Sequence, residues 1–405
     1  MAGIPERTAE SDPSLRTPTA LCLGGIAIGV AEFLPVGLLP DIARAMRITI
    51  PQAGYLLSAY ATGVVVGAPL LVALGLKYPP QRVLIAFMAL FGACNALFAL
   101  AHSYRLLVLS RFLSGLPHGA FFGLGAVVAA RLAPRGQQAG AVAVMFAGLT
   151  VANVLLVPAG TYVGHHASWR LPFAIVSILS FLTAWAISKQ IPSLSVVPER
   201  RVAVTLQEVI QPRFWPLIGI SAIGTGGLYA WISYIAPLVT EVTGLAHSEV
   251  AVVMILAGVG MAIGNWAGGR LADRFHALNV VCTVLFAMLA CTLLVSGFAH
   301  HKVATLVLTV VTGAVAFAII APLQMLMLSA APGAKMMASA LMQSTANVGN
   351  ALGAYLGGLG IAYGYGFASP EIIGAGLVAV GLACALMLKM RSSQAAGLAP
   401  VGAQS

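Results

Sequence analysis

The sequence is poor in charge. Of its 405 residues only 8% are Asp, Glu, Lys or Arg, whereas 60% are hydrophobic and the mean hydropathy is +0.95. Soluble domains carry about 25% charged residues, so this chain lacks the charge needed to cover a water-facing surface. Its long continuous apolar runs differ from the short segments of alternating polarity that build membrane β-barrels. The composition therefore predicts an all-α polytopic membrane protein.

Motifs of soluble enzymes and metal sites are also missing. All five cysteines fall inside apolar runs, without the paired spacing of a disulfide framework or a zinc site. The chain has no GxSxG, no HExxH and no phosphate-binding GxxxxGK[ST]. The net charge of +10 is explained by Lys and Arg in cytoplasmic loops rather than by nucleic-acid binding. We therefore expect no enzymatic activity, no cofactor, no metal and no nucleic-acid partner, and any uphill transport would use an ion gradient.

Apolar runs long enough to cross a bilayer occur twelve times. They span approximately 19–39, 53–76, 83–101, 106–130, 139–163, 171–187, 214–239, 250–269, 280–298, 303–328, 338–363 and 372–388. With both termini inside, fifteen of the 21 Lys and Arg residues fall in inner segments, five in outer segments and Arg111 in a span. The positive-inside rule thus predicts that both termini are cytoplasmic.

The chain divides into two halves. The longest segment between spans, 188–213, has three prolines and a charged PERR run, which is typical of a linker. TVANV at 150–154 and STANV at 344–348 are offset by 194 residues, and the loops after the second and eighth spans match at an offset of 197. These offsets indicate two parallel six-span repeats. We predict a cytoplasmic tail at 1–18, six-helix bundles at 19–187 and 214–390, the linker at 188–213 and a second cytoplasmic tail at 391–405.

Two charged residues stand out inside the predicted spans, Glu32 in the first and Arg111 in the fourth. Each lies about 12 Å below the outer interface at 1.5 Å per residue, so the two can meet if their spans are neighbours. Buried membrane charges are functional by default, and we interpret this pair as a proton-coupling site. Burial favours the neutral acid, whereas a guanidinium favours the carboxylate. The alternative is a structural ion pair that fixes helix packing.

Polar and aromatic residues of other spans are candidates for a substrate cavity. They are His118, Phe121, Phe122, Asn153, Tyr229, Trp231, Tyr234, Gln324, Met325 and Asn347. A neutral sugar would use Trp231, Tyr234 and Gln324, whereas a lipophilic drug would use the other aromatic residues and Met325. Packing inside a bundle is the alternative for these residues, and an ordinary core histidine is the alternative for His118.

Glycines and prolines are expected to shape two of the spans. Gly115 and Gly119 would allow close helix approach, and Pro117 would free a backbone carbonyl. Pro158 and Gly160 occupy the fifth span in the same way.

The loop after the eighth span contains a candidate cytoplasmic gate. It reads GRLADRF and carries Gly269, Asp273 and Arg274. Because a helix N-terminus attracts an acid, we hypothesise that Asp273 bridges to the start of the fifth span near Gly140 and closes the inner side. A solvated loop aspartate is the alternative.

Four stretches together resemble the major facilitator superfamily. They are AEFLPVGLLPDIA at 31–43, RFLSGLPHGAFFG at 111–123, TVANVLLVPAGTY at 150–162 and SWRLPF at 168–173. More narrowly, the chain is similar to the twelve-span drug:proton antiporters of bacteria and, among them, to the AraJ-like and sugar-efflux exporters. The resemblance implies a central cavity lined by spans 1, 4, 7 and 10, a cavity-facing Glu32 and an Arg111 implicated in proton coupling. In two motifs the chain departs from the family: Leu76 and Lys77 replace an Asp–Arg pair, and Val157 replaces the glycine before the antiporter-motif proline.

These observations predict a multi-pass transporter of the bacterial inner membrane. We expect proton-coupled efflux of small organic molecules such as drugs or sugars, by a monomer in the lipid bilayer. A uniporter or exchanger of sugars or nucleosides is the alternative. A non-transporting receptor is disfavoured because the chain lacks a long cytoplasmic sensor domain.

Overall fold

The computed structural model describes residues 13–75, 78–134, 138–194, 214–330 and 335–397, and these contain helices and no strands. The first half comprises α1 (Pro13–Gly37), α2 (Leu39–Met46), α3 (Ile50–Gly75), α4 (Pro80–Leu100), α5 (Tyr104–Leu132), α6 (Gln138–Val151), the π-helix η1 (Ala152–Leu156), α7 (Val157–His166) and α8 (Arg170–Gln190). The second half comprises α10 (Trp215–Gly219), η3 (Ile220–Gly224), α11 (Gly226–Ser233), α12 (Ile235–Pro237), η4 (Leu238–Val242), η5 (His247–Glu249), α13 (Val250–Arg274), α14 (Ala277–Phe298), α15 (Lys302–Ala318), α16 (Ile320–Ala330), α17 (Lys335–Ala362) and α18 (Ser369–Gly397).

A helix or a run of consecutive helices occupies each of the twelve predicted spans. Within the described ranges, nine helices are long and apolar enough to cross a membrane, and the bent pair Trp215–Ser233 and Ile235–Val242, with an angle of 47°, makes a tenth. Local sequence explains several helix ends. The Ser103 side chain accepts a hydrogen bond from the Leu106 N–H and caps α5, and Gly364 and Gly366 adopt positive φ in the turn before α18.

The helices form two bundles with separate buried cores. One core is built from residues between Ala20 and Ile191, and the other mainly from residues between Phe214 and Ala385. In the first bundle α1 packs against α6, α3 against α5 and α4 against α8. The second bundle repeats these pairings with α11 against α17, α13 against α15 and α14 against α18. The repeated pairings agree with the internal similarity seen in the sequence.

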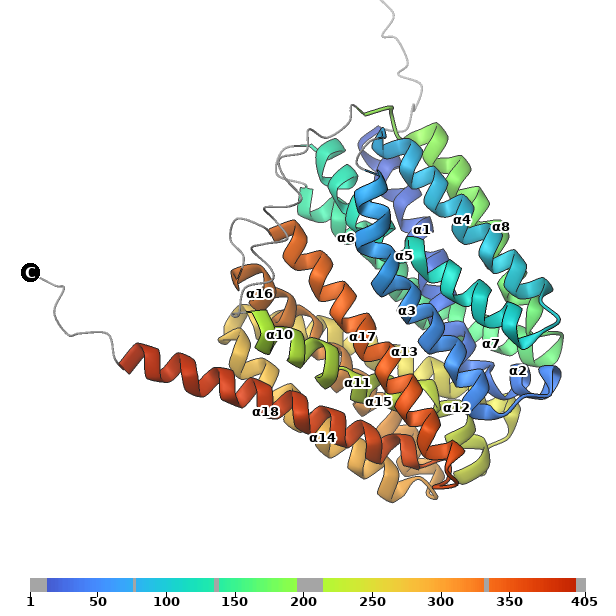
Figure 1. Cartoon of the computed structure of the whole chain (residues 1–405), viewed down its shortest axis with the longest axis vertical. Helices are drawn as coiled ribbons and strands as arrows, with labels where there is room; N and C mark the ends of the chain where they lie inside the picture. The colour runs from blue at the N-terminus through green and yellow to red at the C-terminus, as the bar shows by residue number, and fades with distance from the viewer. Residues whose placement is uncertain (1–12, 76–77, 135–137, 195–213, 331–334, 398–405) are drawn as a thin grey trace, which may run out of the picture.

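The two bundles touch mainly through α3 with α17 and through α7 and η1 with α13. In Figure 1 the bundles converge at the end that carries α2 and α12, which we call the α2 end, and diverge towards the end that carries α6, α10 and α16, which we call the α10 end. Ser58 of α3 donates a hydrogen bond to the Ala351 carbonyl of α17 at 3.1 Å, and the rings of Tyr55 and Tyr355 lie 5.2 Å apart.

Several predicted boundaries differ from the structure. Helix α1 begins at Pro13 inside the predicted tail, α8 runs to Gln190 inside the predicted linker, and α18 continues to Gly397. Most of the linker, and the family departure at Leu76 and Lys77, lie outside the described residues. The segment after the first span, expected as a loop, forms the short helix α2, because its apolar residues Leu39, Pro40, Ile42 and Ala43 are buried on one side.

Candidate proton-coupling site

Arg111 of α5 lies at the centre of the site and is fully buried, with 0% of its surface exposed. Its Nη1 donates a hydrogen bond to the Ala31 carbonyl of α1 at 3.0 Å. The guanidinium carbon lies 4.2 Å from the centroid of the Tyr60 ring of α3, a cation–π distance. Nε and Nη2 have no hydrogen-bond partner among the described residues. The Phe98 ring centroid lies 5.6 Å from the same carbon. The positive charge is therefore compensated incompletely, by one carbonyl and two aromatic rings.

Glu32 follows Ala31 directly and is partly exposed. It interacts electrostatically with Arg111 of the first bundle and with Tyr229 in α11 of the second bundle. The ion pairs formed by the described side chains do not include Glu32 with Arg111. The structural ion pair considered as an alternative is thus not formed here. Arg111 is instead hydrogen-bonded to the carbonyl of Ala31, the residue before Glu32, so the two charged residues lie at the same depth.

Tyr60 connects Arg111 to His118. Its hydroxyl lies 3.0 Å from Nδ1 of His118, and both residues are buried. The His118 ring also packs edge-on against Phe122. Sequence reasoning found Arg111 and His118 but missed Tyr60. The available signal was weak: a tyrosine hydroxyl in the middle of an apolar span needs a partner when it is buried.

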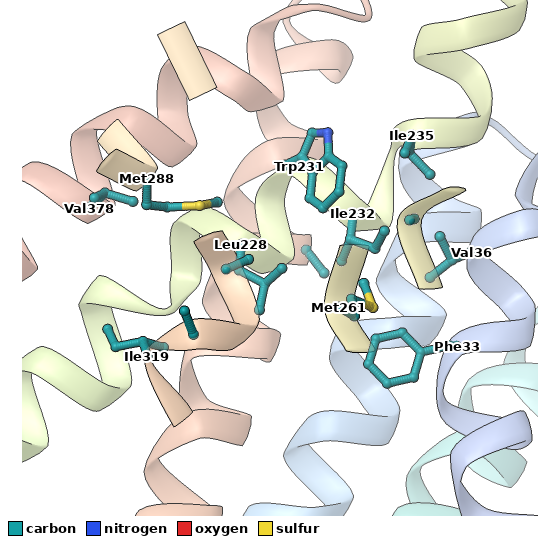
Figure 2. Close-up of a cluster of buried hydrophobic side chains, with 14 of the residues drawn as sticks. Phe33, Val36, Leu228, Trp231, Ile232, Ile235, Met261, Met288, Ile319 and Val378 are labelled. Carbon is teal, nitrogen blue, oxygen red and sulfur yellow. The ribbon is translucent and has the colours of Figure 1, made fainter. Parts of the chain in front are cut away.

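Helix α1 contributes to both bundles at this level. Figure 2 shows Phe33 and Val36 of α1 packed with Met261 and Ile235 of the second half. Ala31 and Leu34 belong instead to the core of the first bundle. The AEF stretch therefore spans the boundary between the bundles: Ala31 binds Arg111, Glu32 remains partly exposed and Phe33 packs against the opposite bundle.

The predicted cavity residues are not all brought together. Phe121 is fully buried, and its ring fills the space beside Gly24 of α1. Phe122 stacks on Phe146 at 5.0 Å. Trp231 and Tyr234 are buried as well, and the Tyr234 hydroxyl donates a hydrogen bond to the Ala354 carbonyl at 2.7 Å. In this conformation these four aromatic side chains pack inside the protein.

The remaining cavity candidates differ in exposure. Tyr229 and Gln324 are partly exposed and Met325 is 44% exposed. Asn153 and Asn347 are buried; Nδ2 of Asn347 donates to the Gln343 carbonyl of its own helix at 3.0 Å. The side-chain oxygens of both asparagines lack a partner among the described residues. Tyr229, Gln324 and Met325 are therefore the members of the set that remain accessible.

The predicted small residues lie where helices approach closely. A Cβ on Gly115 would clash with the Tyr60 carbonyl of α3, and one on Gly119 would lie 2.9 Å from the Cβ of Ala68. Gly160 of α7 faces Leu34 of α1. Pro117 lies inside α5. Pro158 follows the π-helix η1 directly, in the first turn of α7, and π-bulges are one of the usual ways in which a helix changes its hydrogen-bond pattern.

The predicted gate residues are free of such contacts. A Cβ on Gly269 would meet no atom within 4 Å, and Asp273 and Arg274 are exposed at the end of α13. Asp273 is absent from the ion pairs of the described side chains. Residues 135–137 and the side chains of residues 138–140, near the start of the fifth span, lie outside the described part of the chain.

A polar cluster that the sequence did not reveal joins the bundles at the α2 end. Asp41 of α2 lies 3.3 Å from Nδ1 of His165 in α7 and 3.7 Å from Arg44. Arg44 in turn lies 3.4 Å from Nε2 of His247 in η5 of the second bundle, whose ring stacks 5.8 Å from that of His165. These contacts hold the α2 end together across the boundary between the bundles.

Comparison with known proteins identifies the family. Residues 21–338 match the Major Facilitator Superfamily. The chain is 38% identical to the inner membrane transport protein YdhP of Escherichia coli over 93% of this chain and 96% of that protein. It is 34% identical to the putative transporter AraJ of the same organism (85% and 89%) and 32% identical to a chloramphenicol resistance protein of Streptomyces lividans (89% and 93%).

A solved structure shares the fold. The inward-facing, occupied form of a bacterial homologue of the human lysosomal transporter Spinster superposes with a TM-score of 0.73 at 16% identity, covering 92% of this chain and 96% of that one. With this fold, two repeated bundles and relatives aligned along most of their length, the chain is a membrane transporter that belongs to the Major Facilitator Superfamily.

Proposed function

We propose that the protein is a proton-coupled exporter of small organic molecules that works by alternating access, with Glu32 as the proton-binding group. The observation that carries the proposal is the surroundings of Arg111. A fully buried guanidinium, two of whose nitrogens lack a partner among the described residues, lies beside a partly exposed acid at the boundary between the bundles. A buried charge of this kind is costly in a membrane, and function accounts for its presence better than packing does.

In this proposal Arg111 tunes Glu32 without binding it. When Glu32 is ionised, the two charges attract each other across the Ala31 backbone. When Glu32 takes up a proton from the outer side, this attraction is lost. The binding of a substrate that the charged form holds is then weakened. Return to the inward-facing state lets the proton leave. The Tyr60–His118 pair holds Arg111 in place throughout.

The proposed topology assigns a state to the structure. With both termini in the cytoplasm, the α2 end faces outward. Its contacts, from the Arg44–His247 pair to the Tyr55–Tyr355 rings, then close the outer side, and the structure is inward-facing. The exposed Asp273 fits this state, because the proposed gate between Asp273 and the fifth span would form when the inner side closes.

For the substrate we favour a lipophilic organic molecule such as a drug. The accessible candidates Tyr229 and Met325 offer aromatic and adaptable apolar surface, and one relative is a chloramphenicol resistance protein. Gln324 adds one amide. A sugar or nucleoside uniporter or exchanger, the second candidate, would use this amide together with Asn153 and Asn347, whose oxygens lack partners among the described residues.

Proteoliposomes with an imposed pH gradient test the proposal. Labelled chloramphenicol, a hexose and uridine are supplied separately, and solute flux is followed together with the internal pH. We expect chloramphenicol to move against proton flow and to dissipate the gradient, and Glu32→Gln to abolish this while Glu241→Gln, which alters an exposed acid, does not. Equilibration of the hexose or uridine without proton movement would support the second candidate instead.

A further inference from the structure

Glu371 is another acid in the helical bundles and lies one residue before the last span that the sequence predicts. Helix α18 begins at Ser369, so Glu371 lies in its first turn, with 0% of its surface exposed. Both carboxylate oxygens lack a hydrogen-bond partner among the described residues. An ionised carboxylate buried without a partner is strongly unfavourable. Something must therefore neutralise this group in the folded protein.

Glu371 faces α11. Positions 371, 374, 378 and 381 recur every three or four residues and so share one face of α18. On that face Gly374 and Val378 contact Gly227, and Gly381 contacts Gly224. The two segments are antiparallel, and the same register places Glu371 at the level of Ser233, the last residue of α11.

Ser233 offers oxygens at this level. Its hydroxyl is buried and without a partner among the described residues. Its carbonyl would normally accept a hydrogen bond from the residue four positions on, but that residue is Pro237, which has no N–H. The span is bent by 47° at this point. Unwound carbonyls at broken helices are the groups with which transporters coordinate Na⁺ or H⁺.

The helices around Glu371 bring few basic side chains to this position within the described part of the chain. The helices packed against α18 are α10, η3, α11, α14 and α17. Their only charged residue is Lys335, at the opposite end of α17. Lys389 and Arg391 of α18 lie about 27 Å or more along the helix. At the near end His300, His301 and Lys302 are exposed and pair with no carboxylate of the described residues. Among the residues that the structure describes, no cationic side chain forms an ion pair with Glu371.

We propose that Glu371 and Ser233 form a binding site for one monovalent cation, H⁺ or Na⁺, in the second bundle and separate from the Glu32–Arg111 site. As a proton site, Glu371 is held as the neutral acid. As a sodium site, its carboxylate and the two Ser233 oxygens supply ligands of the kind that hard cations prefer. The site does not depend on the substrate or on Glu32.

Thermal unfolding of the full-length protein in detergent tests the site. Wild type and Glu371→Gln, a neutral isostere, are melted in NaCl and in choline chloride at equal ionic strength, and again in sodium-free buffers from acid to alkaline. If Na⁺ binds, wild type gains several degrees in NaCl and the variant does not, because a ligand of the native state raises its stability. If H⁺ binds, wild type loses several degrees more than the variant as the buffer becomes alkaline.

Glu241→Gln, which removes an exposed acid, is the matched control and should respond as wild type does. Equal responses of wild type and Glu371→Gln to both Na⁺ and pH would overturn the proposal. If Glu371→Gln does not fold, infrared difference spectra of Glu32→Gln protein provide the second readout. Addition of Na⁺ or alkali must then change a carboxyl band, and an unchanged carboxyl region under both conditions would equally overturn the site.

Discussion

At the scale of single residues, the site depends on the shape of the Arg111 side chain as well as its charge. The guanidinium donates to the Ala31 carbonyl and lies over the Tyr60 ring at the same time. A lysine keeps the charge but has no planar group that can do both. Arg111 is therefore held to Glu32's helix by a geometry that a single ammonium cannot reproduce.

Arg111→Lys should lower proton-driven transport about 10- to 100-fold, because a hydrogen bond from a charged donor contributes about 1.5–3 kcal/mol. The pH dependence of the remaining transport should also shift, because the tuning charge has moved. Initial rates in proteoliposomes across a pH series measure both effects. Arg105→Lys, at an exposed position at the start of α5, is the control. Wild-type rates and an unchanged pH profile in Arg111→Lys would show that position 111 requires charge alone.

Sequence alone predicted Glu32 and Arg111 because each is a lone charge in an apolar run. It could not predict the Ala31 carbonyl or Tyr60 as the partners of Arg111. Backbone acceptors look identical in sequence, and helix rotation decides which tyrosine faces inward. The sequence did not single out Glu371, because the last predicted span begins one residue later, at 372. Phe121 and Trp231 carried no signal that separates a cavity wall from a bundle core, and the structure places both in cores.

At the scale of helices, α3 and α5 form an unusually close pair. Gly63 and Gly67 of α3 face the backbone of Phe112 and Leu116, and Gly115 of α5 faces the Tyr60 carbonyl. Small residues on both helices let the backbones approach each other. This contact fixes the position of Tyr60 relative to Arg111, so helix packing and site geometry are linked.

Gly115→Ala should destabilise the protein by about 1–3 kcal/mol, the usual cost of overpacking, because the added methyl meets backbone that cannot move aside. Gly123→Ala on the same helix is the matched variant. A methyl there meets no atom within 4 Å, and alanine favours the helix by up to about 1 kcal/mol over glycine. Thermal melting of both variants compares them. Equal melting temperatures would contradict the close packing of α3 and α5.

Helices occupy the predicted spans, but the sequence did not predict that the fifth and seventh are interrupted. Both are interrupted, the fifth by η1 before Pro158 and the seventh by the bend before Pro237. Each proline was visible in the sequence, yet a proline in a membrane helix is tolerated in several ways. Whether a π-turn, a kink or a break results is decided by the neighbouring helices, which the sequence does not display.

At the scale of the whole molecule, the bundles meet at the α2 end, and alternating access requires this end to open. The Tyr55 and Tyr355 rings lie 5.2 Å apart across the bundles. In a background without native cysteines, Tyr55→Cys with Tyr355→Cys should be joined by a short reducible thiol cross-linker. Linked protein should lose transport and regain it on reduction, whereas either single variant should be unaffected by the reagent. Full transport by linked protein would show that this end stays closed during the cycle.

The central claim is that protonation of Glu32 controls which state the protein occupies. Spin labels at Ala45→Cys and Ser248→Cys, exposed positions in the two bundles at the α2 end, report its opening by pulsed EPR. In wild type without native cysteines, the distance distribution should change between acid and alkaline buffer. In Glu32→Gln, which imitates the protonated acid at all pH values, the distribution should be the same in both buffers. A Glu32→Gln protein that still responds to pH as wild type does would contradict the account.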